Sequence, residues 1–81
     1  MMTIKILGTG CKNCRALLEN TQKTVRKMGI DADVEYITDL EKIVSYGVMK
    51  MPALIINQKV MAMGKVLKSE EIEKLIRGIR E

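Results

Sequence analysis

Histidine, tryptophan and phenylalanine are absent from this 81-residue sequence, and proline occurs only once. The only aromatic residues are Tyr36 and Tyr46, which we expect to pack with their hydroxyl groups at the edge of the core. The core must therefore be built from aliphatic side chains and methionine. Structural zinc sites use four cysteine or histidine ligands, so two cysteines without a histidine cannot complete such a site within one chain.

Long apolar runs are also absent. No segment approaches the roughly 18 consecutive apolar residues that a membrane-spanning helix needs. The amino terminus lacks the charged region, apolar region and cleavage site of a signal peptide. We therefore expect a cytoplasmic protein without a membrane partner.

Charge of either sign is spread along the chain. Fourteen basic and 10 acidic residues give a net charge of +4, and the two kinds are interleaved. A surface that binds nucleic acid needs a basic stripe, often with stacking aromatic side chains, and neither is present. We therefore expect no nucleic-acid partner. The length leaves room for one core, which predicts a single domain over residues 1–81 and a monomer.

Both cysteines lie in one stretch, Gly8-Thr9-Gly10-Cys11-Lys12-Asn13-Cys14-Arg15. An apolar run at residues 4–7 precedes this stretch, and a helical pattern follows it. A C-x-x-C motif between a strand and a helix is typical of thioredoxin-like redox proteins. Because structural disulfides are rare in the cytoplasm, a close cysteine pair there is expected to be catalytic or metal-binding.

The position of the two cysteines predicts how they react. With Cys11 at the start of the helix and Cys14 one turn later, both sulfur atoms lie on one face and can form a disulfide. Free backbone N–H groups and the helix dipole would stabilise a thiolate on Cys11. Lys12 and Arg15 add positive charge, and Lys12 and Asn13 would tune the loop. We therefore expect Cys11 to attack and Cys14 to resolve.

Two glycines, Gly8 and Gly10, precede the cysteine pair. We expect both to adopt backbone angles closed to other residues and to leave Cys11 open to a partner. A G-x-G pattern without a third spaced glycine is a weak phosphate-binding motif. Because the two cysteines already account for this loop, phosphate binding is the less favoured interpretation.

Four strands are predicted along the chain. Their expected ranges are residues 3–7, 34–37, 53–56 and 60–63. The turn-forming residues Asn57-Gln58-Lys59 predict that the last two strands form an antiparallel hairpin. Gly64 is expected to end the hairpin.

Three helices are predicted between and after these strands. The first covers residues 13–28 and ends at Gly29, the second opens with a Thr38-x-x-Glu41 capping box and ends at Gly47, and the third is capped by Ser69. The positions expected to be buried are Leu17, Leu18, Thr21, Val25 and Met28, then Leu40, Ile43 and Val44, and finally Ile72, Leu75, Ile76 and Ile79. The order β-α-β-α-β-β-α predicts a layered α/β domain, with a mixed four-stranded sheet flanked by three helices.

The second half of the chain adds a resemblance to a known family. The stretch Met51-Pro52-Ala53-Leu54-Ile55-Ile56-Asn57-Gln58-Lys59-Val60 is followed by Gly64-Lys65 and by Ser69-Glu70-Glu71-Ile72. Together with the C-x-x-C motif and the order of elements, these residues resemble the small redox-active disulfide proteins, which have a minimal thioredoxin-like fold. The likeness covers essentially the whole chain.

This resemblance implies a thiol–disulfide oxidoreductase or redox carrier whose only redox group is its own disulfide, without a further cofactor. Its implied partners are protein disulfide or dithiol substrates and an upstream reductase. The resemblance also implies that Pro52 is cis and faces the disulfide, and that the backbone of Met51 pairs with an extended substrate segment. The sequence departs from typical thioredoxins in having Lys12-Asn13, rather than Gly-Pro, between the cysteines.

Two other functions use the same residues. Two thiolates could bind a soft ion such as Cu(I), and a dimer could share four thiolates around zinc, so soft-metal binding stays open. An adaptor that keeps the fold without activity is the third class. The seven methionines, including Met49, Met51, Met61 and Met63, are expected to fill core gaps rather than to bind copper, although Met49 and Met51 could form an adaptable surface.

Overall fold

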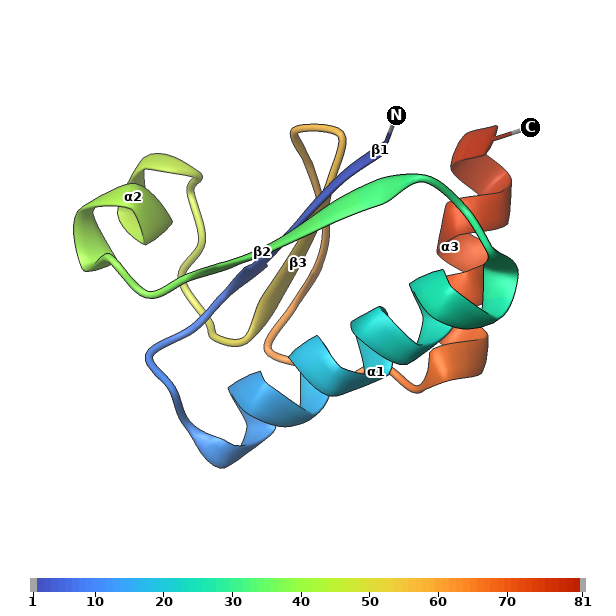
Figure 1. Cartoon of the computed structure of the whole chain (residues 1–81). Coiled ribbons are helices and arrows are strands. Elements are labelled where there is room, and N and C mark those ends of the chain that lie inside the picture. The colour runs from blue at the N-terminus through green and yellow to red at the C-terminus, as the bar shows by residue number, and fades with distance from the viewer. Residues whose placement is uncertain (1, 81) are drawn as a thin grey trace.

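The computed structural model describes residues 2–80 and has the predicted order of elements (Figure 1). The strands are β1 (Met2–Leu7), β2 (Ala32–Ile37), β3 (Ala53–Ile56) and β4 (Lys59–Met63). The helices are α1 (Lys12–Met28), α2 (Leu40–Ser45) and α3 (Ser69–Arg80). The strands form one sheet in the order β2-β1-β3-β4, in which β1 and β2 are parallel and the other two pairs are antiparallel. The predicted α/β fold with a mixed sheet is confirmed.

The alternation of side chains along the strands divides the core into two layers. Ile4 and Ile6 of β1 are fully buried in the cluster that also contains Leu17 of α1 and Ile72 and Ile76 of α3. The other face of the sheet carries the smaller cluster of Leu7, Ile43, Val48, Ala53 and Ile55. Accordingly, α1 and α3 pack side by side, and α2 lies apart from them (Figure 1). No helix of the described chain is long and apolar enough to span a membrane.

The amphipathic pattern of α1 is confirmed. Leu17 and Thr21 are buried, and Leu18, Val25 and Met28 pack against the larger cluster. Gly29 ends the helix in the left-handed conformation with φ of 63°, and its N–H donates to the carbonyl oxygens of residues 25 and 26. The predicted cap is therefore correct.

The hairpin of β3 and β4 is also confirmed, with a tighter turn than predicted. Asn57 and Gln58 have φ angles of 49° and 71°, as a two-residue type I′ turn requires. Lys59 already belongs to β4 and pairs with Ile56. The Asn57 side-chain oxygen accepts a hydrogen bond of 3.0 Å from the Thr3 N–H, which fixes the turn against β1.

The sequence prediction for α2 is wrong in two respects. Its N-cap is Asp39, whose carboxylate accepts the Glu41 N–H at 3.0 Å, instead of Thr38. Only Ile43 is buried, whereas Leu40 and Val44 are 59% and 69% exposed. A helix of six residues makes fewer than two turns, so only one of its apolar side chains reaches the sheet.

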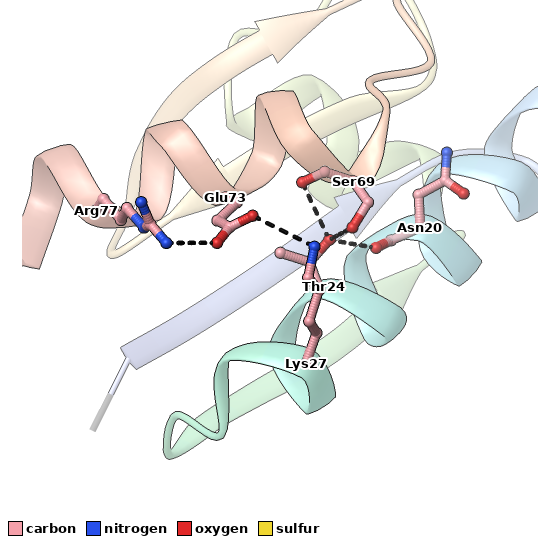
Figure 2. A network of polar contacts seen from close by, with 6 residues as sticks. All are labelled: Asn20, Thr24, Lys27, Ser69, Glu73 and Arg77. Atoms are coloured by element: carbon pink, nitrogen blue, oxygen red, sulfur yellow. Dashed lines mark hydrogen bonds and ion pairs between the residues drawn. The ribbon is translucent and has the colours of Figure 1, made fainter.

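The prediction that Ser69 caps α3 is wrong as well. Ser69 is the first helical residue, and its hydroxyl lies 2.7 Å from the Thr24 hydroxyl of α1 (Figure 2). The turn before the helix is closed by Glu71, whose carboxylate accepts the Lys68 N–H at 3.2 Å. The Ser69 side chain therefore joins two helices instead of ending one.

A polar network connects α1 to α3 (Figure 2). The Thr24 hydroxyl donates to the Asn20 carbonyl oxygen at 2.7 Å, so it is an acceptor for the Ser69 hydroxyl. Further along α3, Glu73 accepts a 2.7 Å hydrogen bond from Arg77 and lies 3.8 Å from the Lys27 ammonium. Because Thr24 is fully buried, its hydroxyl interaction has no water to replace it.

We predict that Thr24→Val lowers the free energy of unfolding by about 1 kcal/mol. Valine has nearly the same shape and helix propensity as threonine, so the loss reports the hydrogen bonds of the Thr24 hydroxyl with the Asn20 carbonyl oxygen and the Ser69 hydroxyl together. Urea unfolding measures the change, and Thr38→Val is the control because Thr38 is exposed in a loop. Equal stability of the Thr24→Val variant and the wild type would show that the network contributes nothing.

Candidate redox site

The loop between β1 and α1 presents the first cysteine at the helix amino terminus. Cys11 is the N-cap of α1, with extended backbone angles of −68° and 164°, and its carbonyl oxygen accepts the Arg15 N–H at 3.0 Å. The preceding residue, Gly10, has φ of 84°, a conformation that favours glycine. The predicted position of Cys11 at the start of the helix is therefore what the structure has, with the helix beginning one residue earlier than predicted.

The two cysteines form a disulfide with very different exposure of its two ends. Their Cα atoms are 5.1 Å apart, inside the range that a disulfide needs. Cys11 is exposed, whereas Cys14 is fully buried on the inner side of the first helical turn. A partner molecule can therefore reach the sulfur of Cys11 but not that of Cys14.

The surroundings of the Cys11 sulfur favour negative charge. The Cys14 N–H donates to it at 3.2 Å, so an otherwise unpaired amide of the first turn points at the sulfur. No acidic residue lies in the first turn of α1, and the exposed basic residues Lys12 and Arg15 flank the pair. The helix dipole adds to this field, and thiolates are stabilised at such positions. Asn13 is exposed beside them.

Gly8 is needed at the site because it has no side chain, and not because of its backbone angles. A Cβ atom built on Gly8 would lie 2.5 Å from the Cys14 sulfur and 2.7 Å from the Cys14 Cβ. Its φ is not in the left-handed region, unlike that of Gly10, so the predicted conformational role holds for Gly10 alone. Gly8 is therefore required because a bare Cα is all that fits against the buried sulfur.

Tyr36 is a site residue that the sequence reasoning missed. Its hydroxyl accepts the Gly10 N–H at 2.8 Å, although the two residues are 26 positions apart. The sequence predicts that Tyr36 packs in the core, and its ring does pack against the larger cluster. The role of Tyr36 in the site follows from the parallel pairing of β1 with β2, which brings the end of β2 beside the cysteine loop.

Met51 and Pro52 lie at the same end of the sheet as the cysteine loop. The peptide bond between them is cis, as the family resemblance implies. Ala53 pairs with Leu7, so the residues just before Ala53 adjoin the residues just after Leu7. Pro52 is buried, and its carbonyl oxygen accepts the Gly64 N–H at 2.9 Å, while Met51 is 38% exposed.

The methionines near this end do not fill core gaps as predicted. Met49, Met51 and Met63 are all exposed, with Met49 at 92%, whereas Met61 packs against the larger cluster. The alternative interpretation of Met49 and Met51 as an apolar surface fits their exposure. Within the described residues, no group of three or more histidine, cysteine, aspartate or glutamate side chains is placed to hold a metal ion.

Comparison with known proteins agrees with this geometry. The family model described as a thioredoxin domain matches residues 2–77, which include both cysteines and Met51-Pro52. A thioredoxin of Methanothermobacter thermautotrophicus is 40% identical over 76 residues, covering 94% of this chain and 99% of that protein. A thioredoxin of Methanocaldococcus jannaschii is 33% identical over 81 residues, covering 100% of this chain and 93% of that protein. The chain belongs to the thioredoxin family.

Proposed function

We propose that this protein is a thiol–disulfide oxidoreductase or redox carrier that exchanges its Cys11–Cys14 pair with protein partners. One observation carries the proposal: an exposed sulfur at a helix N-cap is bonded to a buried sulfur one turn away. The first is open to a partner and the second can reach only the first. Membership of the thioredoxin family supports the same chemistry.

The exchange proceeds in two balanced steps. In the reduced protein the Cys11 thiolate attacks one sulfur of a partner disulfide, forming a mixed disulfide, and the other partner sulfur leaves as a thiolate. Cys14 then loses its proton and attacks the Cys11 sulfur, which reforms the Cys11–Cys14 disulfide and releases the second partner thiolate. Two electrons have passed from the protein to the partner. An upstream reductase returns two electrons to the disulfide.

Met51 and Pro52 are proposed to bind the substrate segment. Met51 is 38% exposed and adjoins the cysteine loop, and its backbone is proposed to pair with an extended chain, a small case of strand addition. The exposed thioethers of Met49 and Met51 offer flexible apolar contacts that suit more than one partner. Lys12, Asn13 and Gly10 would then shape the loop that the partner meets.

The cytoplasm is the compartment we propose, with the protein acting as a monomer. A C-x-x-C pair with one exposed sulfur cycles between the disulfide and the dithiol. The reducing systems of the cytoplasm supply the electrons that return the disulfide to the dithiol. The proposal needs no metal and no organic cofactor, because both electrons reside in the cysteine pair.

Catalysed reduction of a protein disulfide tests this function. Dithiothreitol is the electron source, and the rate is followed with and without the protein. We expect a rate that rises in proportion to protein concentration, with the Cys11→Ser/Cys14→Ser double variant at the background rate. If the wild-type protein adds nothing to the dithiothreitol rate but binds Cu(I) stoichiometrically through both thiols, the redox function is wrong and the metal carrier is right.

A further inference from the structure

Tyr36 reaches the redox loop from the neighbouring strand. It lies opposite Ile6 in the parallel pairing of β1 with β2, so its side chain is on the face of the sheet that α1 covers. From there its hydroxyl accepts the Gly10 N–H at 2.8 Å. Gly10 directly precedes Cys11, so this hydrogen bond fixes the position of the backbone next to the exposed cysteine.

The same hydroxyl lies close to the buried sulfur. A Cβ atom on Gly8 would meet the Cys14 sulfur at 2.5 Å and the Tyr36 hydroxyl oxygen at 3.5 Å. Both atoms therefore border one small space, which only a glycine at position 8 leaves open. Tyr36 thus contacts the loop before one cysteine and borders the same small space as the sulfur of the other.

We propose that Tyr36 is a positioning residue for the redox pair. By holding Gly10, its hydroxyl keeps the Cys11 sulfur within bonding distance of the Cys14 sulfur and so favours the disulfide over the dithiol. The equilibrium between these two states depends on how closely the protein holds the two sulfur atoms together. This inference rests on the proposed function for its biological meaning, whereas the equilibrium itself can be measured without any partner protein.

Equilibration with glutathione measures that equilibrium directly. The protein dithiol gives two electrons and two protons to glutathione disulfide, which becomes two glutathione thiols, while the Cys11–Cys14 bond forms. Tyr36→Phe removes the hydroxyl and keeps the ring. We expect the equilibrium constant for disulfide formation to fall about fivefold, the effect of one ordinary hydrogen bond. For a two-electron couple this raises the midpoint potential by about 20 mV.

Tyr46→Phe is the matched control. Tyr46 is the only other tyrosine and is also half-buried, but its hydroxyl accepts a 2.7 Å hydrogen bond from Lys5 on the opposite face of the sheet. That hydrogen bond raises the pKa of Lys5 above its ordinary value of 10.5. Tyr46→Phe therefore removes a hydroxyl that makes a hydrogen bond outside the redox loop. We expect its equilibrium constant with glutathione to equal that of the wild type.

Tyrosine fluorescence tests whether Tyr36 lies beside the cysteine pair, and it does so without measuring the redox equilibrium. Because the chain has no tryptophan, emission comes from Tyr36 and Tyr46 alone. A disulfide quenches a phenol beside it, so reduction should raise the emission of Tyr46→Phe, in which Tyr36 remains. The emission of Tyr36→Phe should hardly change on reduction.

An unchanged equilibrium constant in Tyr36→Phe would overturn the proposal, and so would an equal change in both variants. If Tyr36→Phe does not fold, amide hydrogen exchange in the oxidised wild-type protein decides instead. A protected Gly10 amide supports the proposal, and a freely exchanging one contradicts it. Failure of the proposed function has a different signature, since the wild type would then not reduce protein disulfides while its equilibrium with glutathione still responded to Tyr36.

Discussion

Cys11→Ser is expected to reduce the rate of protein disulfide reduction to the background, a loss of at least about 1,000-fold. Cys11 is the exposed member of the pair, and a partner disulfide cannot reach the fully buried Cys14. A serine hydroxyl at the same N-cap accepts the same amide hydrogen bond but is a poor nucleophile. The fold should therefore survive while the chemistry is lost.

Cys14→Ser should behave differently, because the attacking thiolate remains. Without a second sulfur one turn away, the mixed disulfide on Cys11 is not resolved, and the variant should accumulate as a covalent complex with its partner. Non-reducing electrophoresis of each variant with an oxidised test protein measures this. Wild-type rates in both single variants, or a trapped complex with Cys11→Ser instead of Cys14→Ser, would contradict the assignment of roles.

Gly8→Ala should lower the free energy of unfolding by about 1–3 kcal/mol, the usual range for overpacking a core. The new methyl group would lie 2.5 Å from the Cys14 sulfur and 2.7 Å from its Cβ atom. The Gly8 N–H is bonded to the Ile37 carbonyl oxygen at 3.0 Å, so the strand resists a shift to make room. The sulfur must then move, and disulfide formation should weaken together with stability.

Gly78→Ala is the matched control for that substitution. Gly78 lies in the last turn of α3 with open space where its Cβ would be, so the same methyl group meets no clash. Alanine is favoured over glycine in a helix interior by up to about 1 kcal/mol, which predicts a gain in stability. Denaturant unfolding of the two variants should give changes of opposite sign. A Gly8→Ala variant as stable as the wild type would mean that the contact with Cys14 is not tight.

The sequence predicts local and periodic features of this protein well. The C-x-x-C motif, the glycine that ends α1 and the apolar faces of α1 and α3 all depend on residues a few positions apart, and the structure contains each of them. The prediction of a cis bond before Pro52 comes from the family resemblance and not from a local pattern, and the structure has that bond.

The errors concern contacts that only the folded chain creates. Leu40 and Val44 have the spacing of a buried face, but α2 is too short to bring them to the sheet. The local sequence predicts that Ser69 caps α3, but in the fold its hydroxyl contacts the hydroxyl of Thr24, which lies 45 positions away in α1. Tyr36 and Gly8 likewise gain their roles from a loop and a sulfur that strand pairing brings to them.

The pH dependence of Cys11 alkylation in the reduced protein tests the central claim most directly. Because the first-turn amides favour the Cys11 thiolate, its reaction with iodoacetamide should reach half of its maximal rate at a lower pH than that of an ordinary thiol, whose pKa is about 8.5, while the buried Cys14 reacts far more slowly. A Cys11 midpoint at or above about 8.5, or equal reactivity of the two cysteines, would contradict the account.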